Sequence, residues 1–328
     1  MTLEPRKFSE RLGVIDPGQL FEVAELFDLG EVLDAYPLAG GLFGQNLGLE
    51  TSEGRFVLRG NPHGHIQLLK ERFIAQFIDE NSSLPAPWPY EVSDDTDIFG
   101  WTFAIMPLLP GTMGEELRRT ADDRGRLDLA DATGEALASL HDAEADFFGP
   151  YDPQMNAFIE MEDFADWSLH RLNHWRNQCR AVNALSTEAE LLIDTIIEEN
   201  AGALNEPFTP VLVHHDFKYG NLNYDPSTYE ATGVFDVFEA YLGDGEEDIV
   251  RMLWLVKDEA ERRAFVTAYT ENWPLRPGAA QRLTLYTLVD RLVVWEYGRR
   301  LGIWFEDTTF VADVQPFLAN ARAVGSSG

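Results

Sequence analysis

The stretch that decides the fold is VLVHHDFKYGNLNYDPSTYEATGVFDVFEAYLGDGEED, residues 211–248. It contains His214, Asp216 and Asn221 in the spacing His-x-Asp-x-x-x-x-Asn, and Asp236 follows after a turn. The turn at 225–228, DPST, separates two short strand-like segments and predicts a β-hairpin. Such a hairpin would bring Asn221 and Asp236 to one edge. The stretch therefore gathers two carboxylates and an amide within one local structure.

These residue types suit phosphoryl transfer. That reaction needs a carboxylate that orients a hydroxyl group and takes its proton, together with oxygen ligands that hold Mg²⁺ against phosphates. Asp216 is the predicted catalytic base, and Asn221 and Asp236 are the predicted metal ligands. Lys218 is predicted to place its ammonium group near the transferring phosphoryl group, where charge stabilisation matters most. His214 is predicted to brace the loop by hydrogen bonds.

The bulk composition places the chain in a broad class. Its 328 residues, 45% of them hydrophobic, suit two lobes better than one domain. The single cysteine, Cys179, excludes an intrachain disulfide. No apolar run approaches the roughly 20 residues of a membrane helix, and the first residues lack the apolar segment of a secretory signal. We therefore expect a cytoplasmic protein.

The net charge of −31 is unusual. It argues against nucleic acids and anionic membranes as partners, because both attract basic patches. Two interpretations remain open. One is a solvated acidic surface that aids solubility, as in a salt-rich cytoplasm, and the other is an acidic cleft that attracts a cationic substrate. The sequence does not indicate an oligomeric state.

The order of predicted elements indicates an α+β protein with a small β-rich lobe followed by a larger, mainly helical lobe. Helical spacing predicts helices over 8–35, 65–80, 127–142, 158–202, 246–272 and 279–303, and strand patterns dominate 36–60 and 210–236. Prolines and glycines near 107–111 predict a hinge. The predicted domains are an N-terminal lobe over 1–106, the hinge over 107–111, a helical lobe over 112–324 and a flexible tail over 325–328.

Three segments of the opening stretch resemble the aminoglycoside phosphotransferase and choline kinase-like family, which has a two-lobed protein-kinase-like fold. They are HHDFKYGN, GVFDVFEA and GDGEED. The resemblance implies that Asp216 is the base and that Asn221 and Asp236 bind metal. It further implies that three residues shape the start of the next helix, namely Gly243, Asp244 and Asp248. The chain departs from the family pattern at two positions, with His215 in place of glycine and Val237 in place of an aromatic residue.

The resemblance also extends to a nucleotide site. Glycines let backbone N–H groups approach phosphates, so Gly40 and Gly41 predict a phosphate loop, and an ordinary glycine-rich hairpin is the alternative. Asn46 completes the element that resembles the family's Gly-Gly-x-x-Asn. Arg59 stands where the family has a basic residue that binds phosphate oxygens. Glu71, on the next predicted helix, is expected to hold Arg59, with a solvated helix face as its alternative.

The segment 106–110, at the end of the apolar stretch TFAIMPLLPG, is expected to contact the adenine. Met106 would lie against the base, and Leu108 would supply the backbone N–H, because Pro107 has none. A plain apolar connector is the alternative for this segment. The cofactors implied are ATP or GTP and Mg²⁺.

The acceptor is the least determined part of the site. Four acidic residues near the end of the opening stretch are candidates for binding the ammonium groups of a substrate: Glu239, Asp244, Glu246 and Glu247. Ordinary surface acidity is the alternative. The leading hypothesis is an O-phosphotransferase that acts on an antibiotic such as an aminoglycoside. A metabolic kinase for choline, ethanolamine, homoserine or a sugar-like alcohol is the second, and a non-catalytic kinase-like binding protein is the third.

Overall fold

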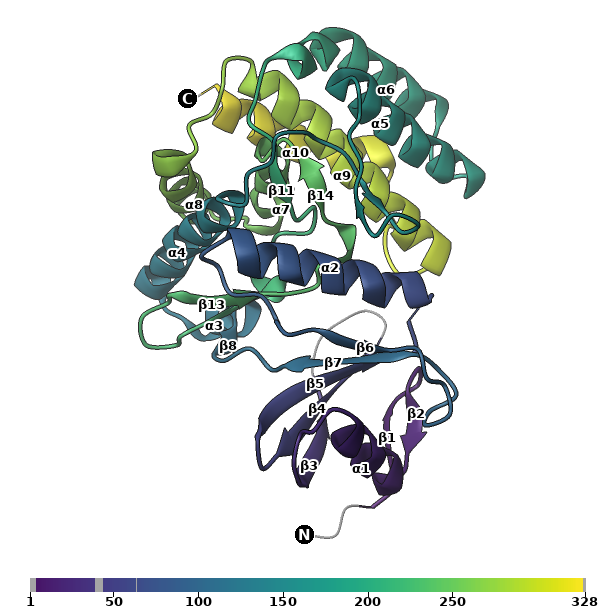
Figure 1. Cartoon of the computed structure of the whole chain (residues 1–328). Coiled ribbons are helices and arrows are strands. Elements are labelled where there is room, and N and C mark those ends of the chain that lie inside the picture. Colours follow the sequence, from purple (N-terminus) through teal and green to yellow (C-terminus); the bar gives the residue numbers. More distant parts are fainter. Residues whose placement is uncertain (1–3, 39–43, 63, 327–328) are drawn as a thin grey trace. The chain divides into compact units, whose positions relative to one another are not determined.

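The structure is a computed structural model that describes residues 4–38, 44–62 and 64–326 (Figure 1). The chain forms two compact units. Unit 1 comprises residues 1–117, 151–157 and 219–238, and unit 2 comprises residues 118–150, 158–218 and 239–328. The hairpin of the opening stretch thus belongs to the N-terminal unit, although the predicted boundary assigned it to the helical one. Within the described ranges, no helix is long and apolar enough to cross a membrane.

Unit 1 is built on a five-stranded antiparallel sheet with the order β3-β4-β5-β7-β6. Its core contains Leu47, Leu49 and Leu58, which are fully buried. A smaller sheet has the order β13-β12-β8. The elements that begin in this unit are β1 (Arg6–Ser9), β2 (Gly13–Ile15), α1 (Pro17–Leu26), β3 (Val32–Pro37), β4 (Asn46–Thr51), β5 (Gly54–Gly60), α2 (His65–Asn81), β6 (Glu91–Ser93), β7 (Phe103–Pro107), β8 (Thr112–Met113), α3 (Gly114–Thr120), β9 (Tyr151–Asp152), β10 (Ala157–Phe158), η2 (Tyr219–Asn221), β12 (Leu222–Tyr224), β13 (Ala231–Val234) and η3 (Val237–Glu239).

The predicted helix over 8–35 is wrong at both ends. Residues 6–15 form the β1–β2 hairpin, and α1 begins only at Pro17. Asp16 caps α1, because its side chain accepts a hydrogen bond from Gly18 and its own N–H donates to the Gln19 side chain. At its other end α1 stops at Leu26, and β3 begins at Val32, within the predicted helix.

Unit 2 is mainly helical, with α9 at its centre, packed against α5, α6, α7 and α10. Figure 1 shows α4 and α8 side by side. They approach closely at Gly134, where an added Cβ would lie 2.3 Å from the carbonyl oxygen of Phe265. The elements of this unit are α4 (Asp123–His141), α5 (Phe164–Ala181), α6 (Thr187–Asn200), η1 (Ala201–Asn205), β11 (Val211–Val213), β14 (Tyr241–Gly243), α7 (Glu246–Leu255), α8 (Glu259–Asn272), α9 (Ala279–Leu301) and α10 (Phe310–Gly325).

Capping residues explain where these helices begin. Asp122, Asp163 and Asp258 each accept a hydrogen bond from a backbone N–H in the first turn of α4, α5 and α8. Their carboxylates also favour the positive end of each helix dipole. The predicted helices over 127–142 and 279–303 match α4 and α9 within a few residues, whereas 158–202 and 246–272 each contain two helices, and α10 was not predicted. At the other end of the chain, α10 includes Gly325, the first residue of the predicted flexible tail.

Candidate active site

The nucleotide half of the predicted site lies in unit 1, where the sheet register joins two of its residues. Asn46 on β4 pairs with Arg59 on β5. The Arg59 guanidinium donates a hydrogen bond to the Asn46 side-chain oxygen at 3.1 Å. Side chains directly opposite in an antiparallel pair lie close enough to interact. The register thus places the amide and the guanidinium on one face of the sheet.

Arg59 is held by Glu71, as the sequence predicted. The Arg59 Nε lies 2.6 Å from one Glu71 carboxylate oxygen, and Nη2 donates to the other at 2.7 Å. Gln67 and Tyr90 also donate to the Glu71 carboxylate, at 2.9 Å and 2.7 Å. Burial opposes the charged form of Arg59, but the attraction of Glu71, Tyr90 and Asp236 outweighs it and raises the pKa of Arg59. Arg59 is therefore a fixed, permanent cation.

The hairpin of β12 and β13 brings the two predicted metal ligands together, as expected. Leu222 pairs with Val234, and the Phe235 N–H donates to the Asn221 carbonyl oxygen at 3.0 Å. The turn is held by Asp225, which accepts hydrogen bonds from Ser227. Asn221 and Asp236 therefore lie at the open end of one hairpin, next to each other across the two strands.

Asp236 is the exposed member of this pair. Its φ is +64°, a left-handed conformation that aspartate tolerates better than most residues. Its side chain is 46% exposed, and Oδ1 lies 3.5 Å from Nη2 of Arg59. A carboxylate and an amide oxygen are hard donors of the kind that Mg²⁺ prefers. The donor set fits Mg²⁺ bound partly through substrate phosphates. Among the described residues no group of three or more His, Cys, Asp or Glu side chains is arranged to hold a metal.

The predicted catalytic loop lies in unit 2 and follows β11. Its backbone is anchored by Asp248 in the first turn of α7, which accepts hydrogen bonds from the N–H groups of His214 and His215, each at 2.7 Å. The Nδ1 of His214 accepts the N–H of Asp216 at 3.2 Å, so His214 braces the loop as predicted. His215 has a φ of +67°, a backbone conformation that glycine adopts without strain. This conformation explains why the family pattern has glycine at this position.

The Asp216 carboxylate lies between two cations. Lys218 Nζ donates to Oδ2 at 2.5 Å, and Arg251 Nη1 lies 3.3 Å from Oδ1. Burial opposes ionisation, but Arg251 and Lys218 together lower the pKa of Asp216 below its ordinary value. Asp216 is therefore ionised at neutral pH. Arg251 was not among the predicted site residues. In the sequence it is marked only by its position one helical turn after Asp248.

Within the same loop, His215 contacts a second arginine, Arg171. Arg171 donates to both oxygens of Glu247, at 3.0 Å and 3.2 Å, and its Nη2 lies 3.4 Å from Nε2 of His215. The guanidinium also lies over the ring of Tyr241, 4.1 Å from its centroid. Burial, reinforced by Arg171 and Arg251, lowers the pKa of His215 to about 3. His215 is thus a neutral side chain next to the predicted base.

Three of the four acidic residues predicted to bind the acceptor are buried and already have arginine partners. Arg282 binds Glu246 through Nε at 2.8 Å and Nη2 at 2.9 Å, and Arg276 is paired with Asp244. Arg171 neutralises Glu247. These carboxylates hold the start of α7 to neighbouring elements, so the structure does not support a role in binding ammonium groups. Only Glu239 of the four is exposed.

Two further predictions concern the nucleotide. The N–H of Leu108 donates to the Arg55 carbonyl oxygen at 2.9 Å. This donor is therefore already used within the sheet and is not available to an adenine. Met106 is buried on β7, paired with Val57. Gly40 and Gly41 lie outside the described residues.

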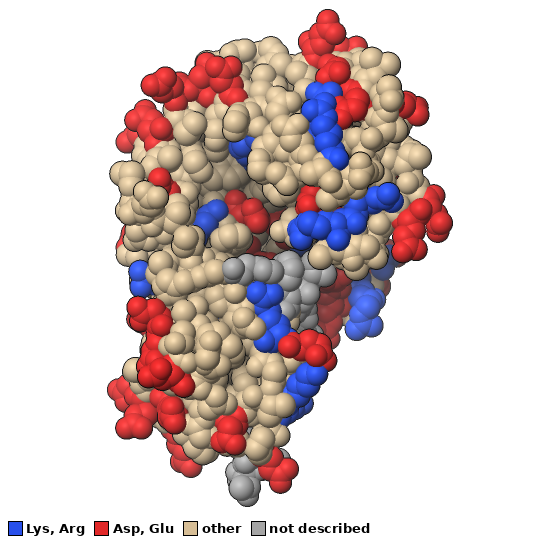
Figure 2. Space-filling view, turned by 90° about the vertical axis from the view of Figure 1, so that its right-hand side faces the viewer, with Lys and Arg blue, Asp and Glu red and all other residues tan. Residues whose placement is uncertain are grey.

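The charge of the chain is spread widely. Figure 2 shows acidic side chains at many separate places on the visible face, and several basic ones, mostly across its middle. This distribution favours the solvated acidic surface over a single acidic cleft.

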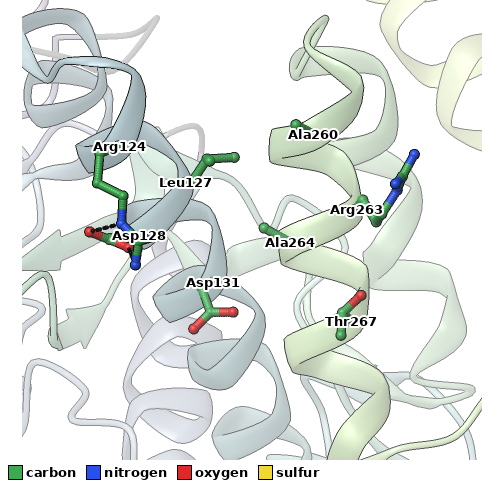
Figure 3. A pocket seen from close by; sticks show the side chains of 8 residues that line it. All are labelled: Arg124, Leu127, Asp128, Asp131, Ala260, Arg263, Ala264 and Thr267. Atoms are coloured by element: carbon green, nitrogen blue, oxygen red, sulfur yellow. Dashed lines mark hydrogen bonds and ion pairs between the residues drawn. The ribbon is translucent and has the colours of Figure 1, made fainter.

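A surface depression of about 430 Å³ lies between α4 and α8 (Figure 3). It contains an ion pair between Arg124 and Asp128 at 2.7 Å on α4, opposite Arg263 and Thr267 on α8. None of the predicted site residues lines it.

Comparison with known proteins identifies the family. A model of the Phosphotransferase enzyme family matches residues 34–280, well over half of the chain. The chain belongs to this family. The resemblance drawn from the three motif segments is therefore confirmed. The prediction that the protein is an enzyme that transfers phosphoryl groups is confirmed as well.

Curated relatives of this phosphotransferase are distant. The probable acyl-CoA dehydrogenase IBR3 of Arabidopsis thaliana is 26% identical over 62% of the chain, which covers only 25% of that protein. A homoserine kinase of Methylobacillus glycogenes is 25% identical over 76% of the chain and 74% of its own length.

Solved structures confirm the predicted fold class of this phosphotransferase. A thermostable mutant of the aminoglycoside phosphotransferase APH(4)-Ia, in a ternary complex with AMP-PNP and hygromycin B, is 19% identical. The match covers 94% of this chain and 98% of that one, with a TM-score of 0.65. The gentamicin–APH(2″)-IIa complex is 18% identical, and the match covers 94% of this chain and 98% of that one, with a TM-score of 0.57. The two-lobed, protein-kinase-like α+β fold is thus shared.

Proposed function

We propose that this enzyme transfers the γ-phosphoryl group of ATP or GTP to a hydroxyl group of a small molecule, with Asp216 as the base. The observation that carries the proposal is the state of the Asp216 carboxylate. It is kept ionised by Arg251 and Lys218, on a loop whose backbone is fixed by Asp248. An ionised, fixed carboxylate suits proton transfer from a hydroxyl group.

Asp216 orients the acceptor hydroxyl and accepts its proton. A new bond forms between the acceptor oxygen and the γ-phosphorus. At the same time the bond between that phosphorus and the nucleoside diphosphate breaks, and its electron pair stays on the diphosphate oxygen. Lys218 lies on the same loop, and its side chain is 31% exposed. When it leaves Asp216 for the transferring group, its charge stabilises the phosphoryl oxygens.

In unit 1, Asn221 and Asp236 would hold Mg²⁺, and Arg59 would bind phosphate oxygens of the nucleotide. When bound there, Mg²⁺ would supply positive charge that offsets the charge of the phosphates. Support comes from the adjacency of Asn221 and Asp236 at the hairpin end and from the fixed position of Arg59 between Asn46 and Glu71. A cytoplasmic location agrees with a nucleoside triphosphate as the phosphoryl donor.

Two acceptor classes are in competition. The aminoglycoside hypothesis is supported by the shared fold of enzymes solved with hygromycin B and gentamicin. It loses support from the structure, because Asp244, Glu246 and Glu247 are buried against arginines. A metabolic alcohol such as homoserine, choline or ethanolamine needs no such polyanionic surface. The homoserine kinase relative also favours this second class.

The test is an assay of nucleoside diphosphate release with ATP or GTP, with and without Mg²⁺. Acceptors are hygromycin B, gentamicin, homoserine, choline and ethanolamine, and phosphorylated products are identified by mass spectrometry. Asp216→Asn is expected to abolish transfer, while Asp225→Asn, at the exposed turn of the hairpin, keeps it. Near-normal turnover in Asp216→Asn would refute the base assignment.

A further inference from the structure

Helix α7 presents two side chains, one turn apart, to the loop that contains Asp216. Asp248 binds the N–H groups of His214 and His215 and so fixes the backbone. Arg251 follows three residues later, and residues with this spacing lie on the same face of a helix. Its Nη1 lies 3.3 Å from Oδ1 of Asp216. One helix thus contacts both the backbone of the loop and the carboxylate that it carries.

Arg251 is itself held on two sides. Its Nη2 lies 2.8 Å from Oδ1 of Asp290 on α9, and both side chains are largely buried. Its guanidinium carbon lies 5.6 Å from the centroid of the Trp254 ring, a further turn along α7. The planar fork of arginine donates in two fixed directions, so a guanidinium bound to Asp290 has little freedom relative to Asp216.

The two cations on Asp216 therefore differ. Lys218 approaches Oδ2 from the same loop on a flexible, part-exposed side chain. Arg251 approaches Oδ1 from a helix that is locked to α9. Of these two cations, Arg251 is the one that connects the carboxylate to the helical core.

We propose that Arg251, fixed by Asp290 and Trp254, is a positioning residue that orients the Asp216 carboxylate toward the acceptor hydroxyl. The proposal rests on the proposed function, in which Asp216 is the base. A displacement of a reacting group by about 1 Å can cost around 100-fold in rate. Loss of Arg251 is therefore expected to lower kcat about 10- to 100-fold, with the KM for the nucleotide within two-fold of wild type.

The test uses the double variant Arg251→Met with Asp290→Asn. Removing both charges leaves no unpaired buried ion, so the fold should be kept. The matched control is Arg291→Met with Asp313→Asn. Arg291 also lies over Trp254, with its guanidinium carbon 4.7 Å from the ring centroid, and binds Asp313 at 2.6 Å. The control is expected to keep wild-type kcat, and a kcat loss equal to that of the test pair would overturn the proposal.

A kcat within two-fold of wild type in the Arg251→Met and Asp290→Asn variant would also overturn it. If that variant does not fold, Arg251→Lys decides, because lysine keeps the charge but cannot bridge Asp216 and Asp290 as the guanidinium fork does. Its kcat is expected to fall at least three-fold, and unchanged turnover would contradict the proposal.

Failure of this inference can be told from failure of the proposed function. Asp216→Asn is assayed in parallel: if it stays active, the base assignment fails whatever Arg251 does. If it is inactive while the double variant is fully active, only the positioning role fails. A crystal structure of the double variant gives the same decision without an acceptor, since an unmoved Asp216 carboxylate would contradict the role of Arg251.

Discussion

Arg59 Nε lies 2.6 Å from a carboxylate oxygen of Glu71, and the same guanidinium lies 3.5 Å from Asp236. Glu71 therefore sets where the cation stands relative to the predicted metal ligand. Tyr90 and Gln67 complete the hydrogen bonding of Glu71, so the carboxylate itself has little freedom.

Glu71→Gln should weaken nucleotide binding. The change removes the charge that holds Arg59, and a charge-assisted hydrogen bond is worth about 1.5–3 kcal/mol, or roughly 10- to 150-fold in affinity. Calorimetric titration with ATP and Mg²⁺ measures the effect. Glu80→Gln, at an exposed position near the end of the same helix, should bind like wild type. Equal affinities for Glu71→Gln and wild type would mean that Arg59 does not bind phosphates.

Asp236→Ala should remove the Mg²⁺-dependent part of nucleotide affinity, because it deletes the exposed carboxylate at the hairpin end. The measurement is the Kd for ATP with and without Mg²⁺. Wild type is expected to bind more tightly with Mg²⁺, and the variant to bind equally in both. Asp225→Asn, at the other end of the hairpin, serves as the control, because its amide oxygen can still accept the hydrogen bonds from Ser227. A preserved Mg²⁺ effect in Asp236→Ala would rule out this residue as a metal ligand.

Lys218→Met should lower turnover by about 100- to 1000-fold, the range seen when one charge-stabilising group is removed. Nucleotide affinity should change little, since in the resting structure Lys218 is bound to Asp216. Steady-state kinetics separates the two effects. Lys257→Met, on an exposed lysine of the same unit, is the comparison. Wild-type turnover in Lys218→Met would make the lysine a partner of Asp216 alone.

The sequence predicted much of this site because its signals are local. The spacing from His214 to Asn221 and the turn at 225–228 lie within one short segment, so the hairpin geometry follows from them. The pairing of Arg59 with Glu71 was predicted from the family resemblance, and the two residues lie only 12 positions apart, on a strand and on the helix that follows it.

The parts that were missed depend on contacts far apart in the chain. Asp244 and Glu246 look like surface acids until Arg276 and Arg282, some thirty residues later, are seen beside them. The role of Arg251 similarly depends on Asp290 and on the rotation of α7. Burial of a charge is decided by its partners, and residue type alone does not reveal them.

Arg282→Met should destabilise the protein by about 3–5 kcal/mol, because Glu246 and Asp244 would be left buried with less compensating charge. Arg282 is fully buried and binds both oxygens of Glu246. The free energy of unfolding from urea titration measures the loss. Arg263→Met breaks an exposed pair with Glu259 and should change stability by less than about 1 kcal/mol. Similar stabilities for both variants would show that the buried network contributes little.

His215 should make the wild-type protein more sensitive to acid. Its pKa is about 3 in the folded state, lowered by burial and by Arg171 and Arg251, whereas the unfolded chain has the ordinary value of 6.5. Between these values the unfolded state binds the extra proton, so the free energy of unfolding falls as the pH falls, by up to about 1.4 kcal/mol per pH unit. Above pH 7 this contribution is constant.

The measurement compares wild type with His215→Asn, a residue that tolerates the left-handed backbone at this position. Free energies of unfolding are obtained at pH 7.5, 6.0 and 5.0. Both proteins lose stability as their carboxylates titrate, but the wild type should lose about 2 kcal/mol more by pH 5.0. Asp216 and Asp248 favour the protonated imidazole and so limit the difference. Parallel pH curves for the two proteins would show that His215 takes up its proton equally in the folded and unfolded states.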